Sequence, residues 1–260
     1  MTSITSTYDP AARVARITLA DPERGNAIHP AMVAELGEAV RTADRAGARV
    51  IVLASTGRFF SVGGDLRGMA AADDMAAHLD DLADDLHRVV SDLQRSRAVV
   101  VAAVQGVAAG AGFPLAAAAD VVLAGRSASF TLGYTKVGLS PDGGTSLLVH
   151  TLGLHRTLRL ALLGDRLDAE EAYAAGLVAR VVDDADLETQ TDAVVALLAA
   201  GAPDAQATAK RVVRDAAEPA PEARLRAEAR GITAQAGGPE GAEGVAAFLA
   251  KRAPVFGDGD

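Results

Sequence analysis

The sequence contains no cysteine and no tryptophan, and its aromatic residues amount to six phenylalanines and three tyrosines. Without cysteine, the chain has no disulfides, no thiolate nucleophile and no thiolate metal site. Because aromatic side chains are scarce, alanine, valine and leucine must fill the interior. Half of the 260 residues are apolar, so the sequence predicts a substantial core in one large domain or a domain with a helical appendage.

Long apolar runs and a surplus of basic residues are also missing. The longest apolar runs, 98–104 and 115–119, are too short to cross a bilayer. The first ten residues, MTSITSTYDP, lack the basic and apolar regions of a secretory signal. The net charge of −9 argues against general binding to nucleic acid. We therefore expect a cytoplasmic protein that binds neither membranes nor nucleic acid.

The order of predicted elements indicates an α/β fold. Polarity alternates over 4–8 and 13–19 around an Asp9-Pro10 turn, which predicts an opening β-hairpin. Helical spacing over 31–46 and a short apolar run at 50–54 complete a strand–helix–strand unit. Such a unit is typical of parallel α/β proteins.

Helices and short strands continue to alternate until about residue 185. The pattern predicts a long amphipathic helix over 73–96 and strands at 98–104, 121–124 and 178–182. It also predicts helices over 152–163 and after the capping residue Asp168. Only helical patterns follow. We therefore expect an α/β core over 1–185 and a helical region over 186–260.

The five histidines are scattered and suggest no metal site. His78 and His87 are expected on the solvated face of the helix over 73–96. Neither an HxxxH pattern nor an acidic cluster accompanies them.

Two glycine-containing turns follow predicted strands. In the first, Phe59–Leu66, paired glycines let the backbone approach a ligand, so that the Gly64 amide is free to point at it. The alternative is an ordinary strand-to-helix turn with Asp65 as the helix cap. The second turn, Gln105–Leu115, opens a short helix, whose first N–H groups suit a developing anion.

Gly110 and Gly112 of the second turn also match the start of a dinucleotide-binding fingerprint. Leu115 occupies the third glycine position, however, and Asp120 comes too early to be its acidic residue. Used together, the two turns could polarise a thioester carbonyl and so acidify the neighbouring carbon.

Several segments resemble the crotonase (enoyl-CoA hydratase/isomerase) family in order and spacing over nearly the whole chain. They are Glu23–Ile28, Val50–Leu66, Val104–Asp120, Gly138–Gly144, Asp168–Val182 and Glu243–Phe256. The resemblance implies stacked ββα units with a C-terminal helical tail that serves assembly into a homotrimer or hexamer. It implies an acyl-CoA substrate, with coenzyme A as part of that substrate and no permanently bound cofactor. It also implies that Gly64 and Ala111 donate two amides to the thioester oxygen.

The same resemblance bears on proton transfer. The family's hydratases use two glutamates, and here those positions hold Pro114 and, approximately, Tyr134. Isomerases of the family carry a single acid after a proline, which corresponds to Asp142 in Ser140-Pro141-Asp142-Gly143-Gly144. The alternative for Asp142 is a turn-former or helix cap. A hydrolase elbow is excluded because the segment ends in Asp and has no partner histidine.

By the same resemblance, coenzyme A would contact two segments near the first turn and the last helix. The implied contact residues are Arg24, Ala27, Val62, Gly64, Asp65, Leu66, Arg67, Ala111, Phe248 and Lys251. In the family, the aromatic and the lysine reach the nucleotide of a neighbouring subunit. The alternative for these two is an apolar helix face with a solvated basic edge.

The resulting hypothesis is isomerisation of an unsaturated acyl-CoA, with Asp142 as base. A hydratase of altered mechanism and a catalytically degenerate acyl-CoA binder are the alternatives, since the two glutamates are missing.

Overall fold

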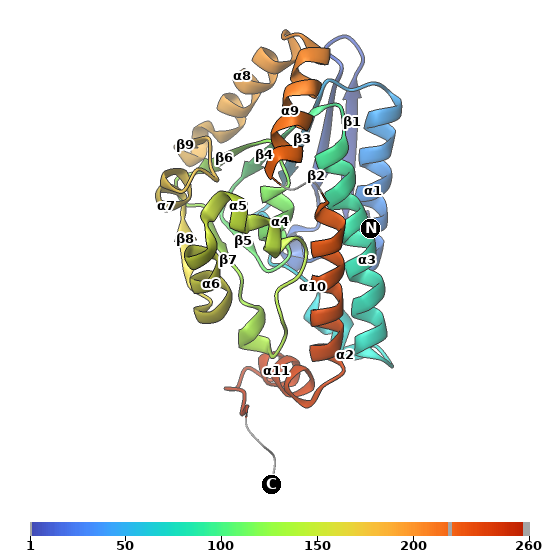
Figure 1. Cartoon of the computed structure of the whole chain (residues 1–260), viewed down its shortest axis with the longest axis vertical. Coiled ribbons are helices and arrows are strands. Elements are labelled where there is room, and N and C mark those ends of the chain that lie inside the picture. Colours follow the sequence, from blue (N-terminus) through green and yellow to red (C-terminus); the bar gives the residue numbers. More distant parts are fainter. Residues whose placement is uncertain (1, 218–219, 257–260) are drawn as a thin grey trace.

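The computed structural model describes residues 2–217 and 220–256, and its centre is a six-stranded sheet with the order β1-β2-β3-β4-β6-β9 (Figure 1). The strands are β1 (Ile4–Asp9), β2 (Val14–Leu19), β3 (Val50–Ser55), β4 (Val99–Val104), β6 (Val121–Gly125) and β9 (Arg180–Val182). β1 pairs antiparallel with β2, and the other pairs are parallel. The predicted opening hairpin and α/β class are therefore confirmed.

A second, smaller sheet lies beside the first and contains β5 (Val107–Ala109), β7 (Ser129–Thr131) and β8 (Arg166–Asp168). Two isolated bridges extend this layer: Ser61 pairs with Ala108, and Ile28 pairs with Gly64. The chain thus passes repeatedly from the large sheet into the small one and then into a helix. This is the stacked ββα arrangement expected from the sequence.

Alternation along the strands decides which helices cover each face of the large sheet. Val100, Ala102 and Val104 of β4 face the main core with α1 (Pro30–Arg45), α3 (Met75–Arg95) and α10 (Pro221–Ala236). The intervening Val101 and Ala103 belong to a smaller cluster that includes residues of α8 (Leu187–Ala199). The valine- and alanine-rich strands are buried on both faces because helices cover both sides.

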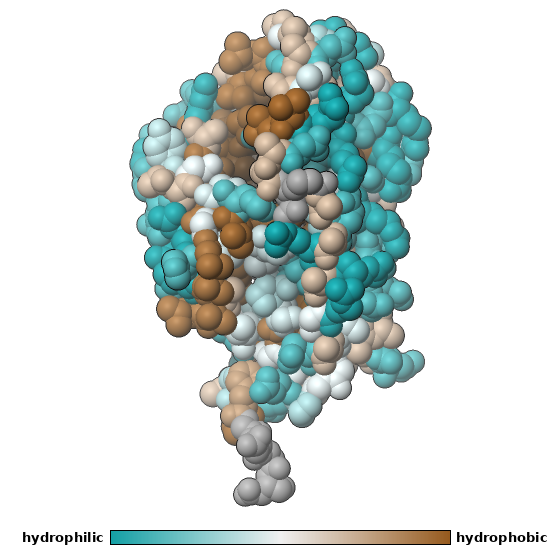
Figure 2. All heavy atoms as spheres, viewed as in Figure 1, coloured by the Kyte–Doolittle hydropathy of each residue, from teal (hydrophilic) through white to brown (hydrophobic). Residues whose placement is uncertain are grey.

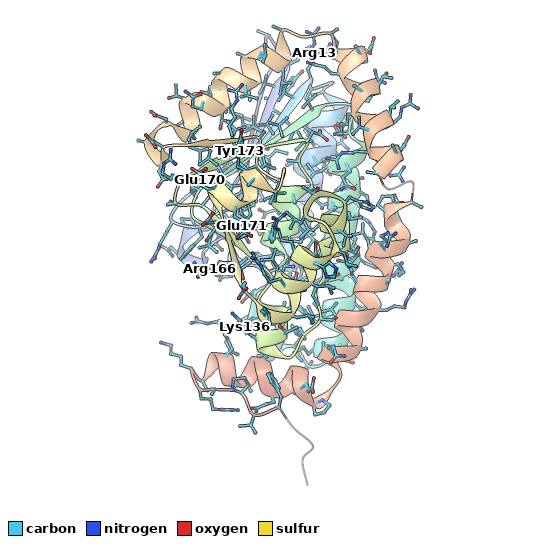
Figure 3. The ribbon with its side chains drawn as sticks, turned by 60° about the vertical axis from the view of Figure 1, so that its left-hand side comes forward. Arg13, Lys136, Arg166, Glu170, Glu171 and Tyr173 are labelled. Atoms are coloured by element: carbon cyan, nitrogen blue, oxygen red, sulfur yellow. The ribbon has the colours of Figure 1, made fainter. Side chains whose placement is uncertain are left out.

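The remaining elements are short or peripheral. They are η1 (Pro22–Arg24), α2 (Leu66–Ala71), α4 (Gly112–Ala117), η2 (Tyr134–Val137), η3 (Thr145–Leu147), α5 (Leu148–Leu152), α6 (Leu154–Leu163), α7 (Ala169–Ala174), η4 (Asp184–Asp186), α9 (Pro203–Ala217) and α11 (Pro239–Leu249). Asp168 caps α7 by accepting from the Glu171 amide, as predicted. Lys136 donates from Nζ to the Gly164 carbonyl, 2.8 Å away, where α6 ends (Figure 3).

One predicted helix differs from the structure. The sequence pattern gave a continuous helix over 152–163, but the chain breaks at Gly153, whose φ is 76°, and so separates α5 from α6. Glycine readily adopts a positive φ with an extended ψ. This conformation interrupts the hydrogen bonding of the helix. Within the described chain, every helix is too short or too polar to span a membrane.

The boundary near residue 185 separates strands from helices, because β9 ends at Val182 and only helices follow among the described residues. The helices after it are nevertheless not a separate unit. α10 packs along α3, and α11 packs against α2 and η2. Helices of the tail therefore complete the core and, as shown below, reach the candidate site.

Candidate active site

The two glycine turns lie side by side. Ser61 and β5 exchange backbone hydrogen bonds, with Ala109 N donating to Ser61 O over 2.8 Å. A Cβ on Gly63 would come within 2.8 Å of the Ala109 carbonyl oxygen, and one on Gly112 within 2.6 Å of the Ser61 Cβ. These two glycines therefore permit close packing of the turns. Gly112 faces Ser61 and not an open phosphate site, which disfavours the dinucleotide-binding alternative.

Asn26 fixes the first turn through hydrogen bonds. This buried residue has a φ of 55°, and its side chain donates to the carbonyls of Thr56 and Phe59 at 3.0 and 2.9 Å. Ser61 Oγ donates to the Asn26 carbonyl and accepts from the Gly63 amide. The loop that carries Gly64 is thereby fixed by buried side chains, which favour a single geometry because unpaired polar groups are costly there.

The amides of Gly64 and Ala111 have no acceptor among residues 2–217 and 220–256. Three amides near them are engaged: Gly63 N bonds to Ser61, Asp65 N to Ile28, and Gly110 N to Thr131. Ala111 immediately precedes α4, where backbone N–H groups are exposed to an incoming acceptor. Backbone donors in such well-ordered segments are usually satisfied, so these two amides are available to a ligand oxygen.

The loop that carries Asp142 packs directly against the second turn. Gly143 has a φ of 77°, and a Cβ there would lie 3.1 Å from the Cβ of Ala111. The Tyr134 hydroxyl donates to the Asp142 carbonyl over 2.9 Å. Asp142, predicted as the base, is therefore brought next to Ala111, predicted as a donor, and is itself only 5 % exposed.

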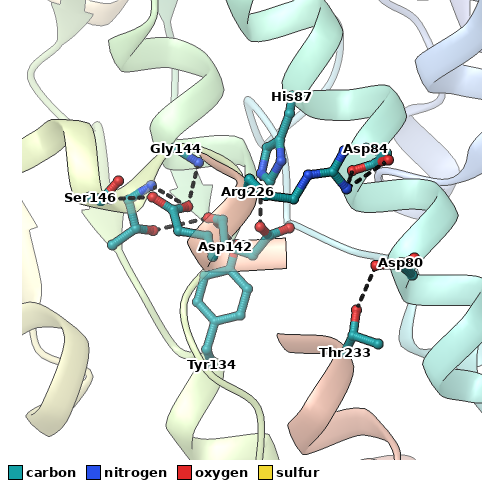
Figure 4. A network of polar contacts seen from close by, with 11 residues as sticks. Asp80, Asp84, His87, Tyr134, Asp142, Gly144, Ser146, Arg226 and Thr233 are labelled. Atoms are coloured by element: carbon teal, nitrogen blue, oxygen red, sulfur yellow. Dashed lines mark hydrogen bonds and ion pairs between the residues drawn. The ribbon is translucent and has the colours of Figure 1, made fainter. Parts of the chain in front are cut away.

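Two residues that the sequence did not point to surround Asp142 (Figure 4). His87 of α3 places Nε2 2.8 Å from Asp142 Oδ1. Glu228 of α10 accepts from the amides of Gly144, Thr145 and Ser146 at 2.8, 3.0 and 2.6 Å. Side-chain atoms of His87, Asp142 and Glu228 all lie within 4.8 Å of one another.

The prediction that His87 lies on a solvated face is wrong. Its side chain is buried because α3 packs against α10 and the Asp142 loop on this side. His78, one of the same predicted pair, is half-buried. A weak signal was present in the sequence: His87 lies four residues after Ala83 and three before Val90, both buried on α3.

Glu228 also carried a signal of this kind. It lies three residues after Leu225 and four before Ile232, which are both buried on α10, so helical spacing places it on the inner face. Imidazole and carboxylate groups are metal ligands in general. Here both Glu228 oxygens already accept amide hydrogens, and we assign no metal to the cluster.

Burial shapes the electrostatics of this region. Burial raises the pKa of Tyr134 well above its ordinary value, and the charges of Asp142 and Glu228 act in the same direction. Burial also raises the pKa of Glu228, while its hydrogen bonds from Ser146 and Gly144 oppose the rise. Tyr134 consequently stays a neutral donor, and the Glu228 anion depends on its three amide partners.

The residues predicted to contact coenzyme A fall into two groups. Hydrogen bonds between 25–28 and 62–65 bring the segments bearing Arg24, Ala27 and Val62 beside Gly64. Asp65 caps α2 by accepting from the Arg67 amide, and both arginines are exposed. The second group is Phe248, which is exposed, and Lys251, which follows α11 with a φ of 53°.

Helix α11 packs against α2 of its own protomer. It therefore brings the chain end that carries Phe248 to the helix that begins with Leu66 and Arg67. No hydrogen bond or ion pair within the described ranges joins Phe248 or Lys251 to either arginine. Their contact with a nucleotide stays a prediction.

A cavity of about 520 Å³ lies behind the candidate site, between the end of α3, α4, α5 and α9. Pro114 and Gly144 form part of its wall, and basic side chains of α3 and α9 form another part. Gly64, Ala111 and Asp142 do not line it. Pro114 and Gly144 therefore separate the cavity from the candidate site.

Comparison with known proteins gives a consistent result. The family model described as enoyl-CoA hydratase/isomerase matches residues 9–259. The chain is 39% identical to a probable enoyl-CoA hydratase of Rhodobacter capsulatus, covering 96% of each, and 37% identical to the 1,2-epoxyphenylacetyl-CoA isomerase of Escherichia coli, covering 94% of each. A crystal structure of an enoyl-CoA hydratase from Mycobacterium avium subsp. paratuberculosis superimposes with a TM-score of 0.89 at 32% identity, covering 98% of this chain and 99% of that one.

Proposed function

Because this chain belongs to the enoyl-CoA hydratase/isomerase family, and so has the crotonase fold and processes acyl-CoA thioesters, we propose that it shifts the double bond of an unsaturated acyl-CoA. The observation that carries the proposal is the placement of one carboxylate, Asp142, beside Ala111, whose amide is unpaired. By the family resemblance, Pro114 and, approximately, Tyr134 stand where hydratases of the family carry glutamates.

The proposed reaction needs two kinds of group. The thioester oxygen accepts hydrogen bonds from the Gly64 and Ala111 amides, which stabilise negative charge as it develops. Asp142 removes a proton from C2 of a 3-enoyl thioester, the electrons delocalise over the dienolate, and the same carboxyl returns a proton at C4. A 2-enoyl thioester results, and no water is consumed.

Hydration is the second candidate, because the similar proteins include hydratases such as the 2,3-dehydroadipyl-CoA hydratase of Escherichia coli, which is 36% identical. In that reaction a water must be oriented and activated between two groups. By the family resemblance, the two glutamates that do this in the hydratases are replaced here by Pro114 and, approximately, Tyr134. This difference favours the single-base reaction.

The test is a panel of 2-enoyl, 3-enoyl, dienoyl and ring-epoxide CoA thioesters, supplied in water labelled with oxygen-18. Isomerisation predicts conversion of 3-enoyl to 2-enoyl thioester without oxygen-18 in the product. Label in the product would support hydration. Binding of every thioester without turnover would indicate a degenerate acyl-CoA binder.

Replacement of the proposed base provides the matched variant. We expect Asp142→Asn to lower kcat by roughly 10²–10⁴-fold, the range for loss of a general base, while acyl-CoA binding persists. Asp204→Asn is the control, since Asp204 is exposed and pairs with Arg97 away from the site. Full activity in Asp142→Asn would eliminate the proposal.

We propose further that coenzyme A binds along Arg24, the 62–67 segment and the end of α11. The exposed charge of Arg67 and Lys251 supports contact with its phosphates. Replacing either residue by Ala should raise the KM for an acyl-CoA but not for the matching acyl-pantetheine, which lacks the nucleotide. An equal rise for both thioesters would contradict this placement.

Assembly into a homotrimer or hexamer through the helical region 186–260 is likewise a proposal. Exposed apolar side chains on α8 and α9 support it, namely Leu197, Val212 and Val213, and α6 adds a stripe of leucines visible in Figure 2. Light scattering after size exclusion would give the mass. Val213→Glu should reduce that mass if this face is an interface.

A further inference from the structure

The contact between His87 and Asp142 distinguishes the two carboxylate oxygens of Asp142. Oδ1 is fully buried and lies 2.8 Å from His87 Nε2. The two atoms are at ion-pair distance, although the alignment falls short of a well-formed hydrogen bond, and neither has another partner in the described chain. Oδ2 accepts no hydrogen bond from any described residue. Oδ1 therefore contacts His87, and Oδ2 is available to a substrate.

We propose that His87 is a positioning residue for Asp142, which holds Oδ1 and leaves Oδ2 as the oxygen that exchanges protons with the substrate. The inference rests on the isomerase function proposed above. His87 approaches from α3 on the buried side and is 6 % exposed. It therefore acts on the carboxylate and not on the substrate.

The surrounding charges explain why an imidazole suits this position. Glu228 faces the pair from α10, and the neutral hydroxyl of Tyr134 faces it from η2. Asp84, one turn earlier on α3, is bonded to Arg226 of α10 at 2.8 Å. On the α1 side, Arg41 lies 3.8 Å from Asp92, further along α3.

Glu228 is therefore the uncompensated neighbour, because its partners are neutral amides. Two carboxylates this close disfavour each other's ionised form. An imidazole that carries a proton on Nε2 offsets that repulsion.

The proton balance follows from this arrangement. Asp142 Oδ2 takes the C2 proton and becomes a carboxylic acid while the electrons move to the thioester oxygen. His87 keeps its own proton and remains against Oδ1. The acid then returns the proton to C4, and the Asp142 carboxylate is restored without exchange with any other group.

The pH dependence of kcat/KM tests the proposal in His87→Gln, with His78→Gln on the same helix as the control. Without the imidazole, the charge of Glu228 is unopposed beside Asp142, so the rate loss should be larger at the acid end of the profile than at the alkaline end. A loss of equal size at every pH would indicate a purely structural role and overturn the proposal.

A second measurement needs no turnover. In protein labelled with nitrogen-15 histidine, the His87 ring signals at one fixed pH should differ between the wild type and Asp142→Asn, whereas those of His78 should not. Unchanged His87 signals would refute the pairing in solution. If the wild type isomerises nothing in the panel, the proposed function fails, whereas this comparison still decides the pairing.

Discussion

Gly143 lies against the methyl group of Ala111, with no space for a side chain of its own. A Cβ at Gly143 would be 3.1 Å from the Cβ of Ala111 and 3.5 Å from a methyl carbon of Leu86. This contact joins the loop of the proposed base to the turn of a proposed donor. The distance between the two groups is thus set by packing between segments about thirty residues apart in the chain.

Replacing Gly143 by Ala should therefore disturb both stability and catalysis. Gly176→Ala is a matched control, since its φ of 80° resembles the 77° of Gly143 but no atom lies within 4 Å of its Cβ position. The shared φ costs roughly 1–2 kcal/mol, and crowding at Gly143 adds roughly 1–3 kcal/mol. Denaturant unfolding gives both values. Equal destabilisation in the two variants would mean that the contact is not tight.

The Ala111 amide can be removed without changing the backbone angle. Ala111 has a φ of −64°, close to the value fixed by proline, so Ala111→Pro deletes the N–H while keeping this angle, although its ring also restricts Gly110. We expect kcat to fall by about 10²–10³-fold, as for loss of one donor to a developing oxyanion. Ala111→Gly keeps the N–H and serves as the control. Wild-type kcat in the proline variant would remove Ala111 from the proposed mechanism.

The hydroxyl of Tyr134 should matter more than that of Tyr8. Tyr134 donates to the buried Asp142 carbonyl, and exposed Tyr8 donates to the Ala46 carbonyl at 3.0 Å. Tyr134→Phe should lower the free energy of unfolding by about 1 kcal/mol, and Tyr8→Phe by less. We also expect a severalfold lower kcat for Tyr134→Phe alone, because the Asp142 loop loses a support. Indistinguishable thermal melts and rates for the two variants would contradict this role.

Glu228 should give the stability a characteristic pH dependence. Because burial raises its pKa in the folded state, the folded protein binds this proton more tightly than the unfolded chain does. The stabilisation is complete below the unfolded pKa of about 4.3 and is lost as pH rises through the folded value.

Comparison with Glu228→Gln isolates this effect. The free energy of unfolding of the wild type minus that of the variant should be largest below about pH 4.3 and decrease as pH rises. Urea titrations at several pH values would measure it. A difference that grows with pH would show that the three amide bonds outweigh the cost of burying the charge.

The strands and most helices could be read from the sequence because their signals are local. Alternation over 4–19 gave the hairpin, and the Asp168 cap three residues before Glu171 gave the start of α7. The glycine turns were also recognisable, although their contact was not. Local patterns missed the break at Gly153, whose positive φ separates α5 from α6 and sets the start of the predicted helix at Leu154.

The sequence by itself determined the fold class and the two glycine turns, since each depends on residues close together in the chain, and its resemblance to the family suggested Asp142 as a candidate base. Only the tertiary structure decided what surrounds that base. His87 comes from α3 and Glu228 from α10, and Glu228 meets Gly144 across 84 residues. Helix packing brings these groups together, and because no short-range pattern encodes which helix faces meet, a histidine expected in water lies buried against a carboxylate.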